Sequence, residues 1–276
     1  MSEHVALITG AAGGIGSATA ARFLEAGTSV VGFDLKVPDH TARTMDAAAA
    51  RGGGEIIWIE GSVTDLGAMA AARDLAVKRF GGVDVWVNNA ARLFVGPFLE
   101  TTDADWLSVL DSNLLGYVRG ARLAAEVMVP RGRGSIINVG SVVEVLPPTE
   151  MSVYVTAKAG VTGLTRALAV ELGPRGVRVN CVSPGATETP LNEESWTDAV
   201  RDTYKARIPL RAIATSDDVA GVIAMVASSD ASYMTGQVVV VDGGLSLDGS
   251  VGHRGTGGHA DKVADREPDG SGTTGA

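Results

Sequence analysis

Three polar side chains near the middle of the chain have the types and spacing needed to move a proton to or from an oxygen atom. Tyr154 and Lys158 are four residues apart, so on a helix both side chains lie on one face. A free phenol has a pKa of about 10, too high for an efficient base at neutral pH, and a nearby ammonium favours the phenolate. Ser141, thirteen residues before Tyr154, would hydrogen-bond a substrate oxygen and stabilise charge there. The alternatives are structural: an amphipathic helix surface for Tyr154 and Lys158, and a helix N-cap for Ser141.

A glycine-rich turn follows the first apolar run of the chain. It reads Thr9-Gly10-Ala11-Ala12-Gly13-Gly14-Ile15-Gly16, and we expect a helix to begin near Gly14. Glycines permit a tight turn and a close approach of pyrophosphate to the backbone, while the helix N-terminus supplies free N–H groups and a positive dipole. A merely flexible turn would also be rich in glycine. Because no Gly-Lys-Ser/Thr occurs, a Walker-type site is excluded.

An acidic residue follows this turn at the spacing used to read a ribose. Asp34 lies eighteen residues past Gly16, at the end of the run Val-Val-Gly-Phe-Asp. An acid at about 20 residues from the glycines accepts hydrogen bonds from the adenosine ribose hydroxyls. Alone, Asp34 could equally be an ordinary turn residue. Combined with the glycine turn, the ribose interpretation is favoured, and it indicates NAD rather than NADP.

The elements that must position these residues alternate along the chain. Short β-branched runs bounded by Gly, Pro, Asn and Asp predict strands, and Ala-rich stretches between them have apolar residues at helical spacing. Strand alternating with helix predicts a single α/β domain, a Rossmann-type, doubly wound, parallel seven-stranded sheet with helices on both faces. The predicted strands are Val5–Thr9, Ser29–Asp34, Glu55–Glu60, Val83–Asn88, Ser135–Val139, Arg178–Ser183 and Val238–Val241. The clearest predicted helices are Ala68–Phe80, Trp106–Met128, Val153–Leu172 and Asp217–Ala227.

Two segments depart from this alternation. Residues about 190–213 are mixed polar and aromatic and longer than an ordinary loop, which is typical of a lid. Residues 248–276 are rich in glycine and lack aromatic residues, so they would not bury enough apolar surface to offset their ordering entropy. We therefore expect one nucleotide-binding and catalytic domain over residues 1–247, with a disordered tail over 248–276.

Composition excludes several classes of protein. The net charge of −9 disfavours nucleic acid as a partner. The single cysteine, Cys181, permits no intrachain disulfide and fits a reducing compartment. The four histidines lie before the first predicted strand, in a loop or in the tail, so neither a Ser-His-Asp site nor a zinc site is expected, and no metal is assigned. Neither a secretory signal nor an apolar membrane span is evident, so we expect no membrane association and a cytoplasmic location.

Several motifs in register resemble the short-chain dehydrogenase/reductase family. The spacing Thr-Gly-x-x-x-Gly-x-Gly at residues 9–16 is followed by Asn88-Asn89-Ala90-Ala91, Asn113, Ser141 with Tyr154-x-x-x-Lys158, Pro184-Gly185 with Thr189, and Asp242-Gly243-Gly244. The resemblance covers roughly residues 3–247. The chain departs from the pattern at three positions. Ser62 stands where the family usually has an aspartate that contacts adenine, Ala91 replaces a glycine, and Thr187 replaces an Ile or Val.

The resemblance implies roles for individual residues. Asn113 would hold a water that relays protons from Lys158, in a helix distorted to make room for it. Lys158 would also hold the nicotinamide ribose, and Thr189 the carboxamide. Asn88 and Asn89 would brace the strand and the cofactor floor, and Arg92, Glu144 and Trp196 are further candidates for the substrate pocket. The expected catalytic residues are Asn113, Ser141, Tyr154 and Lys158; the expected cofactor contacts are Gly10, Gly14, Ile15, Gly16, Asp34, Ser62, Val63, Asn89, Ala90, Tyr154, Lys158, Pro184, Gly185, Thr187 and Thr189.

The resemblance also implies an activity. We expect an NAD(H)-dependent oxidoreductase that interconverts a secondary alcohol and a ketone. One alternative is a 3-oxoacyl thioester reductase, for which Arg131, Arg133 and Arg175 could meet an acidic carrier protein or be solvated helix-end cations. The other is a non-catalytic nucleotide-binding scaffold, which the presence of both Tyr154 and Lys158 disfavours. Small residues along Val153–Leu172 fit the family's pairing of this helix, so we expect a homodimer or homotetramer.

Overall fold

The computed structural model describes residues 4–193 and 196–247, so the expected tail, residues 248–276, lies outside the described residues. Within them, one parallel sheet of seven strands has the order β3-β2-β1-β4-β5-β6-β7. The strands are β1 Val5–Thr9, β2 Ser29–Asp34, β3 Ile56–Glu60, β4 Val85–Asn88, β5 Gly134–Val139, β6 Val177–Pro184 and β7 Val238–Val241. The Rossmann-type, doubly wound sheet predicted from the alternation is confirmed.

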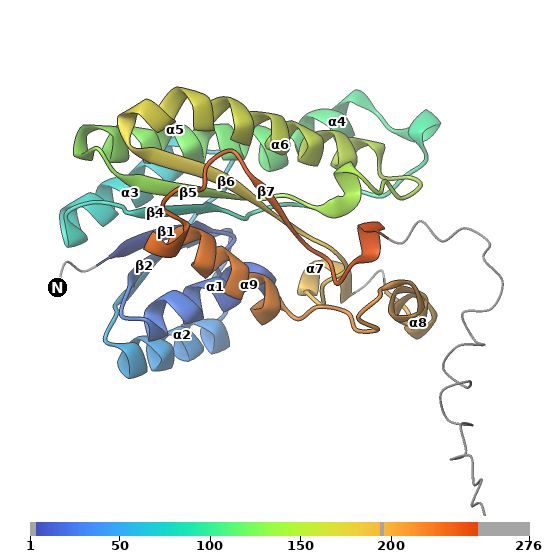
Figure 1. Ribbon diagram of the computed structural model, residues 1–276, viewed down its shortest axis with the longest axis horizontal. Helices are drawn as coiled ribbons and strands as arrows, with labels where there is room; N and C mark the ends of the chain where they lie inside the picture. The colour runs from blue at the N-terminus through green and yellow to red at the C-terminus, as the bar shows by residue number, and fades with distance from the viewer. Residues whose placement is uncertain (1–3, 194–195, 248–276) are drawn as a thin grey trace, which may run out of the picture.

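Helices cover both faces of the sheet (Figure 1). One face carries α3 (Leu66–Phe80), α4 (Asp103–Leu110), α5 (Gly116–Met128) and α6 (Ser152–Leu172). The other carries α1 (Gly14–Glu25), α2 (Asp39–Gly52) and α9 (Ser216–Ala227). Each layer has its own core: Trp86 and Ile136 are fully buried on the first side, and Ile8 and Val87 on the second. Strands buried on both faces explain why the runs are almost continuously apolar.

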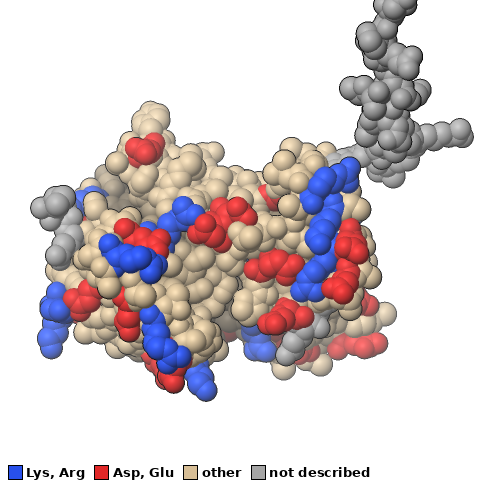
Figure 2. Space-filling model, turned by 90° about the horizontal axis from the view of Figure 1, so that it is seen from below, with Lys and Arg blue, Asp and Glu red and all other residues tan. Residues whose placement is uncertain are grey.

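The outer surface of the α1–α2–α9 layer is polar and mixed in charge. Arg22 pairs with Asp217 across α1 and α9 at 2.6 Å, and Arg51 pairs with Glu25 across α2 and α1. Figure 2 shows basic and acidic side chains close to one another over the face seen there. No helix in the ranges given above is long and apolar enough to cross a membrane.

The strand order reverses beside β1. The chain builds β1, β2 and β3 outward in one direction, then returns so that β4 pairs with the other edge of β1. In open α/β sheets, ligands bind in the crevice at such a reversal, outside the carboxyl ends of the strands. The topology therefore places the glycine turn after β1 and the Asn-Asn motif after β4 at one crevice.

The long helix predicted over Trp106–Met128 is interrupted. The structure has α4, then a π-helical turn at Asp111–Leu115, then α5. In this turn the N–H of Gly116 donates to the carbonyl of Asp111, five residues back. A π-turn inserts a residue into a helix and is frequent at functional sites. The expected distortion at Asn113 is thus confirmed.

The segment expected to form a lid contains two helices, α7 (Pro190–Glu193) and α8 (Asp198–Arg207). Figure 1 shows both beyond the carboxyl end of the sheet. The ring centroids of Trp196 and Tyr204 are 4.9 Å apart, and both side chains pack with Ile208 and Leu245. Arg201 pairs with Glu188 at 2.9 Å. The segment is docked on the domain, and its movement as a lid stays a prediction.

Candidate active site

The glycine turn needs a glycine at three of its positions, Gly10, Gly14 and Gly16. Gly10 and Gly14 have φ values of +67° and +49°. A Cβ at Gly10 would lie 2.8 Å from the Cα of Ala90, and a Cβ at Gly16 would lie 1.9 Å from the carbonyl oxygen of Gly10. The backbone of α1 therefore begins in direct contact with the turn, and its first residues, Gly14 and Ile15, line a large cavity. This is the cradle that a pyrophosphate requires.

Asn89 and Thr9 hold the turn in place from behind. The Asn89 side chain donates to the carbonyls of Thr9 (3.1 Å) and Gly10 (3.0 Å). The hydroxyl of Thr9 accepts from the N–H groups of Asn89 (3.0 Å) and Ala90 (3.2 Å). Asn88 braces the neighbouring strand, since its amide donates to Asn138 at 2.9 Å. Both asparagines brace backbone or neighbouring strands in this way, while their part in a cofactor floor stays a prediction; Asn89 and Ala90 also line the cavity.

Asp34 ends β2 at the wall of the same cavity. Its carboxylate accepts from the N–H of Ala12 (2.8 Å) and from the N–H of Leu35 (2.7 Å). One bond ties it to the glycine turn and the other to its own strand end. The negative charge is therefore fixed beside the turn, where the sequence predicted that the ribose would be read.

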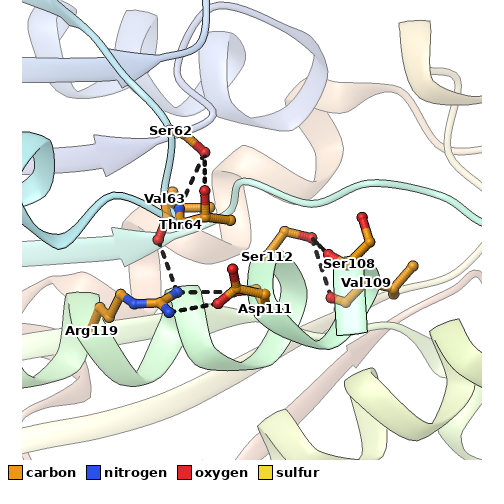
Figure 3. Close-up of polar contacts among 8 residues, drawn as sticks. All are labelled: Ser62, Val63, Thr64, Ser108, Val109, Asp111, Ser112 and Arg119. Carbon is orange, nitrogen blue, oxygen red and sulfur yellow. Dashed lines mark hydrogen bonds and ion pairs between the residues drawn. The ribbon is translucent and has the colours of Figure 1, made fainter. Parts of the chain in front are cut away.

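The loop after β3 forms the next part of the wall. Ser62, Val63 and Thr64 all line the cavity. The hydroxyl of Ser62 accepts from the N–H of Thr64 at 3.2 Å and hydrogen-bonds the Thr64 hydroxyl at 2.8 Å (Figure 3). The side chain that replaces the family's aspartate thus closes a local turn.

The proton-transfer residues meet at the opposite end of the cavity. Tyr154 and Lys158, both on α6, line it together with Ser141, which follows β5. The Lys158 ammonium donates to the carbonyl of Val139 (2.7 Å) and to the hydroxyl of Tyr117 (3.2 Å), and lies 5.7 Å from the ring centroid of Tyr154. The Ser141 hydroxyl accepts from the N–H of Val143 at 3.4 Å. Ser141 therefore caps a short helix and lines the cavity at once.

Burial sets the protonation of this pair. It raises the pKa of Tyr154 to about 12 and lowers the pKa of Lys158 to about 8. The sequence led us to expect that the ammonium would lower the pKa of the phenol, and the net direction in this structure is the reverse. The reason is that desolvation disfavours the charged form of both groups. Tyr154 is consequently a protonated acid at neutral pH. The pKa of Lys158, about 8, lies only about one unit above neutral pH.

Tyr117 is a part of this site that the sequence reasoning missed. It is fully buried on α5, its hydroxyl donates to the carbonyl of Val139 at 3.0 Å, and it accepts from Lys158. Its residue type and apolar neighbours do not separate it from an ordinary core aromatic, since its contact with Lys158 depends on how α5 and α6 pack. Its position four residues after Asn113 was the one available signal.

Asn113 does not line the cavity. It is fully buried in the π-turn, where its amide donates to the carbonyl of Arg92 (2.8 Å). Its oxygen accepts from the N–H of Arg92 (2.9 Å) and from the hydroxyl of Ser112 (2.8 Å). The side chain therefore clamps the strand-end loop rather than facing the ligand. The relay water expected at Asn113 stays a prediction.

Gly16 also differs from its expected role, because it does not line the cavity. Its contribution is the close contact between α1 and the turn described above. The other expected cofactor contacts all lie in the cavity wall. They are Gly10, Gly14, Ile15, Asp34, Ser62, Val63, Asn89, Ala90, Tyr154, Lys158, Pro184, Gly185, Thr187 and Thr189.

The loop after β6 brings the last of these residues to the glycine turn. A Cβ at Gly14 would meet the Thr189 side chain at 3.2 Å. The Thr187 hydroxyl donates to the carbonyl of Gly185 at 3.1 Å, and residue 187 bridges to Ala214. A Cβ at Gly185 would lie 2.5 Å from the Cβ of Asp242, so the Pro-Gly and Asp-Gly-Gly motifs touch.

The remaining wall is mostly apolar. Trp196 and Arg92 line the cavity as expected, whereas Glu144 does not; its carboxylate accepts from the Thr162 hydroxyl instead. The apolar lining comes from the segment after Ser141, from the lid segment and from the C-terminal turn; it includes Val143, Leu146, Pro147, Pro148, Met151, Leu191, Trp196, Val200, Tyr204 and Leu245.

The whole cavity has a volume of about 1620 Å³. One end offers bare backbone, a fixed carboxylate and a polar loop; the other offers a phenol, an ammonium, a serine hydroxyl and apolar walls. This arrangement fits a nicotinamide dinucleotide lying across the crevice, with a substrate beside the phenol. Among the described residues, no group of three or more His, Cys, Asp and Glu side chains is placed to hold a metal ion.

Comparisons with known proteins agree with this geometry. The family model described as enoyl-(acyl carrier protein) reductase matches residues 10–246. The chain is 37% identical to 3beta-hydroxysteroid dehydrogenase 1 of Eggerthella lenta, with 87% of this chain and 93% of that protein covered. It is 36% identical to a 3-oxoacyl-[acyl-carrier-protein] reductase of Thermotoga maritima, with 90% and 99% covered.

A third relative and a solved structure extend the comparison. The chain is 39% identical to cis-4-hydroxycyclohexanecarboxylate dehydrogenase of Sinomonas cyclohexanicum, with 89% of this chain and 97% of that protein covered. The crystal structure of levodione reductase superposes with a TM-score of 0.84 at 31% identity, with 89% of this chain and 98% of that one covered. The protein therefore belongs to the short-chain dehydrogenase/reductase family and is an oxidoreductase of the kind that binds a nicotinamide cofactor.

Proposed function

We propose that this protein is an NAD(H)-dependent dehydrogenase/reductase that interconverts a secondary alcohol and a ketone. The observation that carries the proposal is the pair Tyr154 and Lys158, buried together in the wall of a cavity whose other end is the glycine turn. The nicotinamide cofactor, when bound, supplies or accepts the hydride. The chain itself must then move one proton at the substrate oxygen and stabilise charge there.

Tyr154 performs the proton transfer. With a pKa of about 12 its hydroxyl is neutral at pH 7 and donates to the carbonyl oxygen during reduction. The ammonium of Lys158 then stabilises the phenolate that remains, because it lies 5.7 Å from the ring in a buried setting. In oxidation the same phenolate accepts the alcohol proton. Ser141 donates to the substrate oxygen in both directions, since its hydroxyl lines the same cavity.

The preference for NAD(H) rests on Asp34. NADP carries a phosphate where NAD has the ribose 2′-hydroxyl, and a carboxylate at that point repels it. The two backbone N–H groups that bind Asp34 hold its charge in place. The nearest opposing feature is Lys36, which is exposed two residues further on. A flexible exposed lysine does not remove a fixed carboxylate, so we expect Asp34 to decide the preference.

The cofactor preference is tested by steady-state kinetics with NADH and NADPH. We expect the unmodified protein to favour NADH in kcat/KM by about 10²-fold, the cost of one unpaired charge. Asp34→Ala should narrow the ratio and Asp34→Arg should reverse it, while Lys36→Ala, the matched control, should leave it near the unmodified value. Equal use of both cofactors by the unmodified protein would show that Asp34 does not read the ribose.

The substrate class is tested with a panel of ketones and secondary alcohols, followed by nicotinamide absorbance. The apolar residues around Leu146, Met151 and Trp196 favour alicyclic and other apolar compounds over sugars and polyols. We therefore propose a small apolar molecule as the partner and no nucleic acid. A panel in which only polyols turn over would contradict this substrate class without affecting the assignment of Tyr154.

The alternative of a 3-oxoacyl thioester reductase gains no support from the proposed carrier-docking arginines. Arg131 and Arg133 both pair with Asp84, at 2.9 and 3.5 Å. Asp84 directly precedes β4, so this cluster lies at the amino ends of the strands. The cavity is at the carboxyl ends, and a carrier protein bound at these arginines would be on the wrong side of the sheet.

A further inference from the structure

Arg119 lies behind the cavity wall and contacts two separate parts of it. Its guanidinium donates to the carbonyl of Val63 (3.3 Å), to the carbonyl of Asp111 (3.1 Å) and to the carboxylate of Asp111 (2.5 Å). Val63 and Asp111 line the cavity, whereas Arg119 does not. Figure 3 shows the guanidinium between the loop after β3 and the π-turn. The side chain therefore joins two walls without facing the ligand.

The Ser62–Thr64 loop has few other polar links to the domain, whereas the π-turn is already held by Asn113. The loop is tied to its neighbour by the N–H of Gly61, which donates to the carbonyl of Asp34 at 2.8 Å. Beyond that, Val63 packs on Gly116, where a Cβ would come within 3.1 Å of the valine methyl. The bonds of Ser62 to Thr64 are internal to the loop and do not attach it to the domain. The Arg119 contact is thus the polar link between this loop and α5.

The position of the loop identifies which half of the cofactor it serves. Residue 34 pairs with residue 60 at the ends of β2 and β3, so the loop that begins at Gly61 lies beside Asp34. Tyr154 and Lys158 line the cavity from α6, which packs on β6 on the other side of the strand-order reversal. The loop is therefore at the adenosine end of the crevice, far along the sheet from the proton-transfer groups.

We propose that Arg119 is a positioning residue that holds the Ser62–Thr64 loop against the π-turn and thereby sets the affinity for the adenosine half of the dinucleotide. The inference rests on dinucleotide binding in this cavity. Its physical basis is preorganisation: a loop already fixed in its bound shape loses less conformational entropy when the ligand binds. A planar guanidinium suits this role because it donates to a carbonyl and a carboxylate at once, which an ammonium does less well.

The test compares binding of three probes to Arg119→Met by calorimetry or fluorescence, without turnover. NADH and ADP-ribose carry the adenosine half, and reduced nicotinamide mononucleotide lacks it. We expect the Kd values of NADH and ADP-ribose to rise about 10-fold and that of the mononucleotide to stay unchanged, a tenfold change being about 1.4 kcal/mol. For Arg119→Lys, which keeps the charge, the Kd values of NADH and ADP-ribose should lie between those of the unmodified protein and of Arg119→Met. This variant also guards against a folding failure of the methionine variant.

Arg131→Met provides the matched control. Arg131 also donates to one carbonyl, that of Val83 (3.1 Å), and to one carboxylate, that of Asp84 (2.9 Å), but at the other end of the sheet. Its loss should lower stability without altering any of the three Kd values. Hydrogen exchange on the ligand-free proteins gives an independent measurement: amides of residues 62–65 should exchange faster in Arg119→Met and not in Arg131→Met.

Two results would overturn the proposal. Unchanged NADH affinity in both Arg119 variants would show that the loop needs no support from this side chain. Equal weakening of NADH and of the mononucleotide would show a general distortion of the site. If the unmodified protein bound no NADH at all, the failure would lie in dinucleotide binding itself, and the substrate and cofactor proposals above would fall with it.

Discussion

At the scale of single residues, the site contains two groups whose burial costs stability and serves chemistry. A buried phenol resists ionisation and a buried amine resists protonation, which is why the pKa values move in opposite directions. Tyr154 has no need to be ionised at rest, because reduction begins with its protonated form. Lys158 must carry its charge when the phenolate forms, and a pKa of about 8 keeps it mostly charged at pH 7.

The role of Tyr154 predicts a loss of turnover without a loss of binding. Tyr154→Phe keeps the ring and removes the proton-transferring hydroxyl, so kcat should fall by about 10²–10⁴-fold while the Kd of NADH changes little. Tyr117→Phe is the comparison, since Lys158 would keep its bond to the carbonyl of Val139. It should reduce kcat by less than about 10-fold. Near-normal turnover in Tyr154→Phe would exclude the assignment.

The lowered pKa of Lys158 predicts that replacing this residue stabilises the protein although it destroys the active site. Its folded pKa of about 8 lies below the ordinary lysine value of 10.5, so the charged form is penalised in the fold. At about 1.4 kcal/mol per pKa unit, Lys158→Met should raise the free energy of unfolding at pH 7 by up to about 3 kcal/mol, less the lost hydrogen bonds. The variant should be inactive, and urea unfolding measures the stability.

The stability gained in Lys158→Met should also depend on pH, in a direction that follows from the lowered pKa of Lys158. Between the folded pKa of about 8 and the ordinary lysine value of 10.5, the unfolded chain binds more protons at Lys158 than the folded one. The stability contributed at this residue therefore rises with pH across that window. The advantage of Lys158→Met should be full below pH 8 and shrink as the pH rises towards 10.5; Tyr154 is present in both proteins, so its titration cancels from the difference. An advantage that does not vary with pH would contradict the burial argument.

At the scale of elements, the contact between the glycine turn and α1 determines the shape of the nucleotide site. Gly16→Ala would place a methyl group 1.9 Å from the Gly10 carbonyl oxygen, so the helix must move away from the turn. Overpacking of this kind costs about 1–3 kcal/mol. We expect a Tm lowered by several degrees and a weakened affinity for NADH.

Gly13→Ala is the control for stability, because a Cβ there meets nothing within 4 Å and the residue has an extended backbone. Thermal unfolding should leave Gly13→Ala close to the unmodified protein. If Gly16→Ala and Gly13→Ala had the same Tm, the contact between α1 and the turn would not contribute the stability that we assign to it.

The elements of the fold were predictable from the sequence, whereas the long-range contacts between them were not. Strand runs and glycine spacing predicted the sheet and the turn, because both depend on local rules of side-chain alternation and backbone freedom. A distortion of the helix at Asn113 was expected by resemblance alone, and its form as a π-turn over Asp111–Leu115 was not, since the apolar spacing of the helix continues through it. The contacts of Asn113 with Arg92, and of Lys158 with Tyr117, join segments far apart in the sequence, so no local pattern could predict them.

At the scale of the whole molecule, the site is assembled from nearly every loop at the carboxyl ends of the strands. The lid segment lines one side of the cavity through Trp196 and Tyr204, while the opposite end of the sheet carries the ion pair of Arg131 with Asp84. Substitutions at that opposite end should therefore change stability without changing kinetics. The same division leaves the outer face of α6 without a role in the site.

That outer face predicts how copies of the protein associate. Ala159, Gly163 and Ala167 are exposed along α6, and Val170 on the same helix is 80% exposed. A stripe of small residues beside an exposed apolar side chain suits close packing against the same helix of a second copy, in a two-fold symmetric contact. We expect a homodimer or homotetramer by light scattering at micromolar concentration. Gly163→Arg should dissociate it, whereas Ala71→Arg, an equally exposed change on α3, should not. A monomeric unmodified protein, or an oligomer that survives Gly163→Arg, would exclude this helix as the interface.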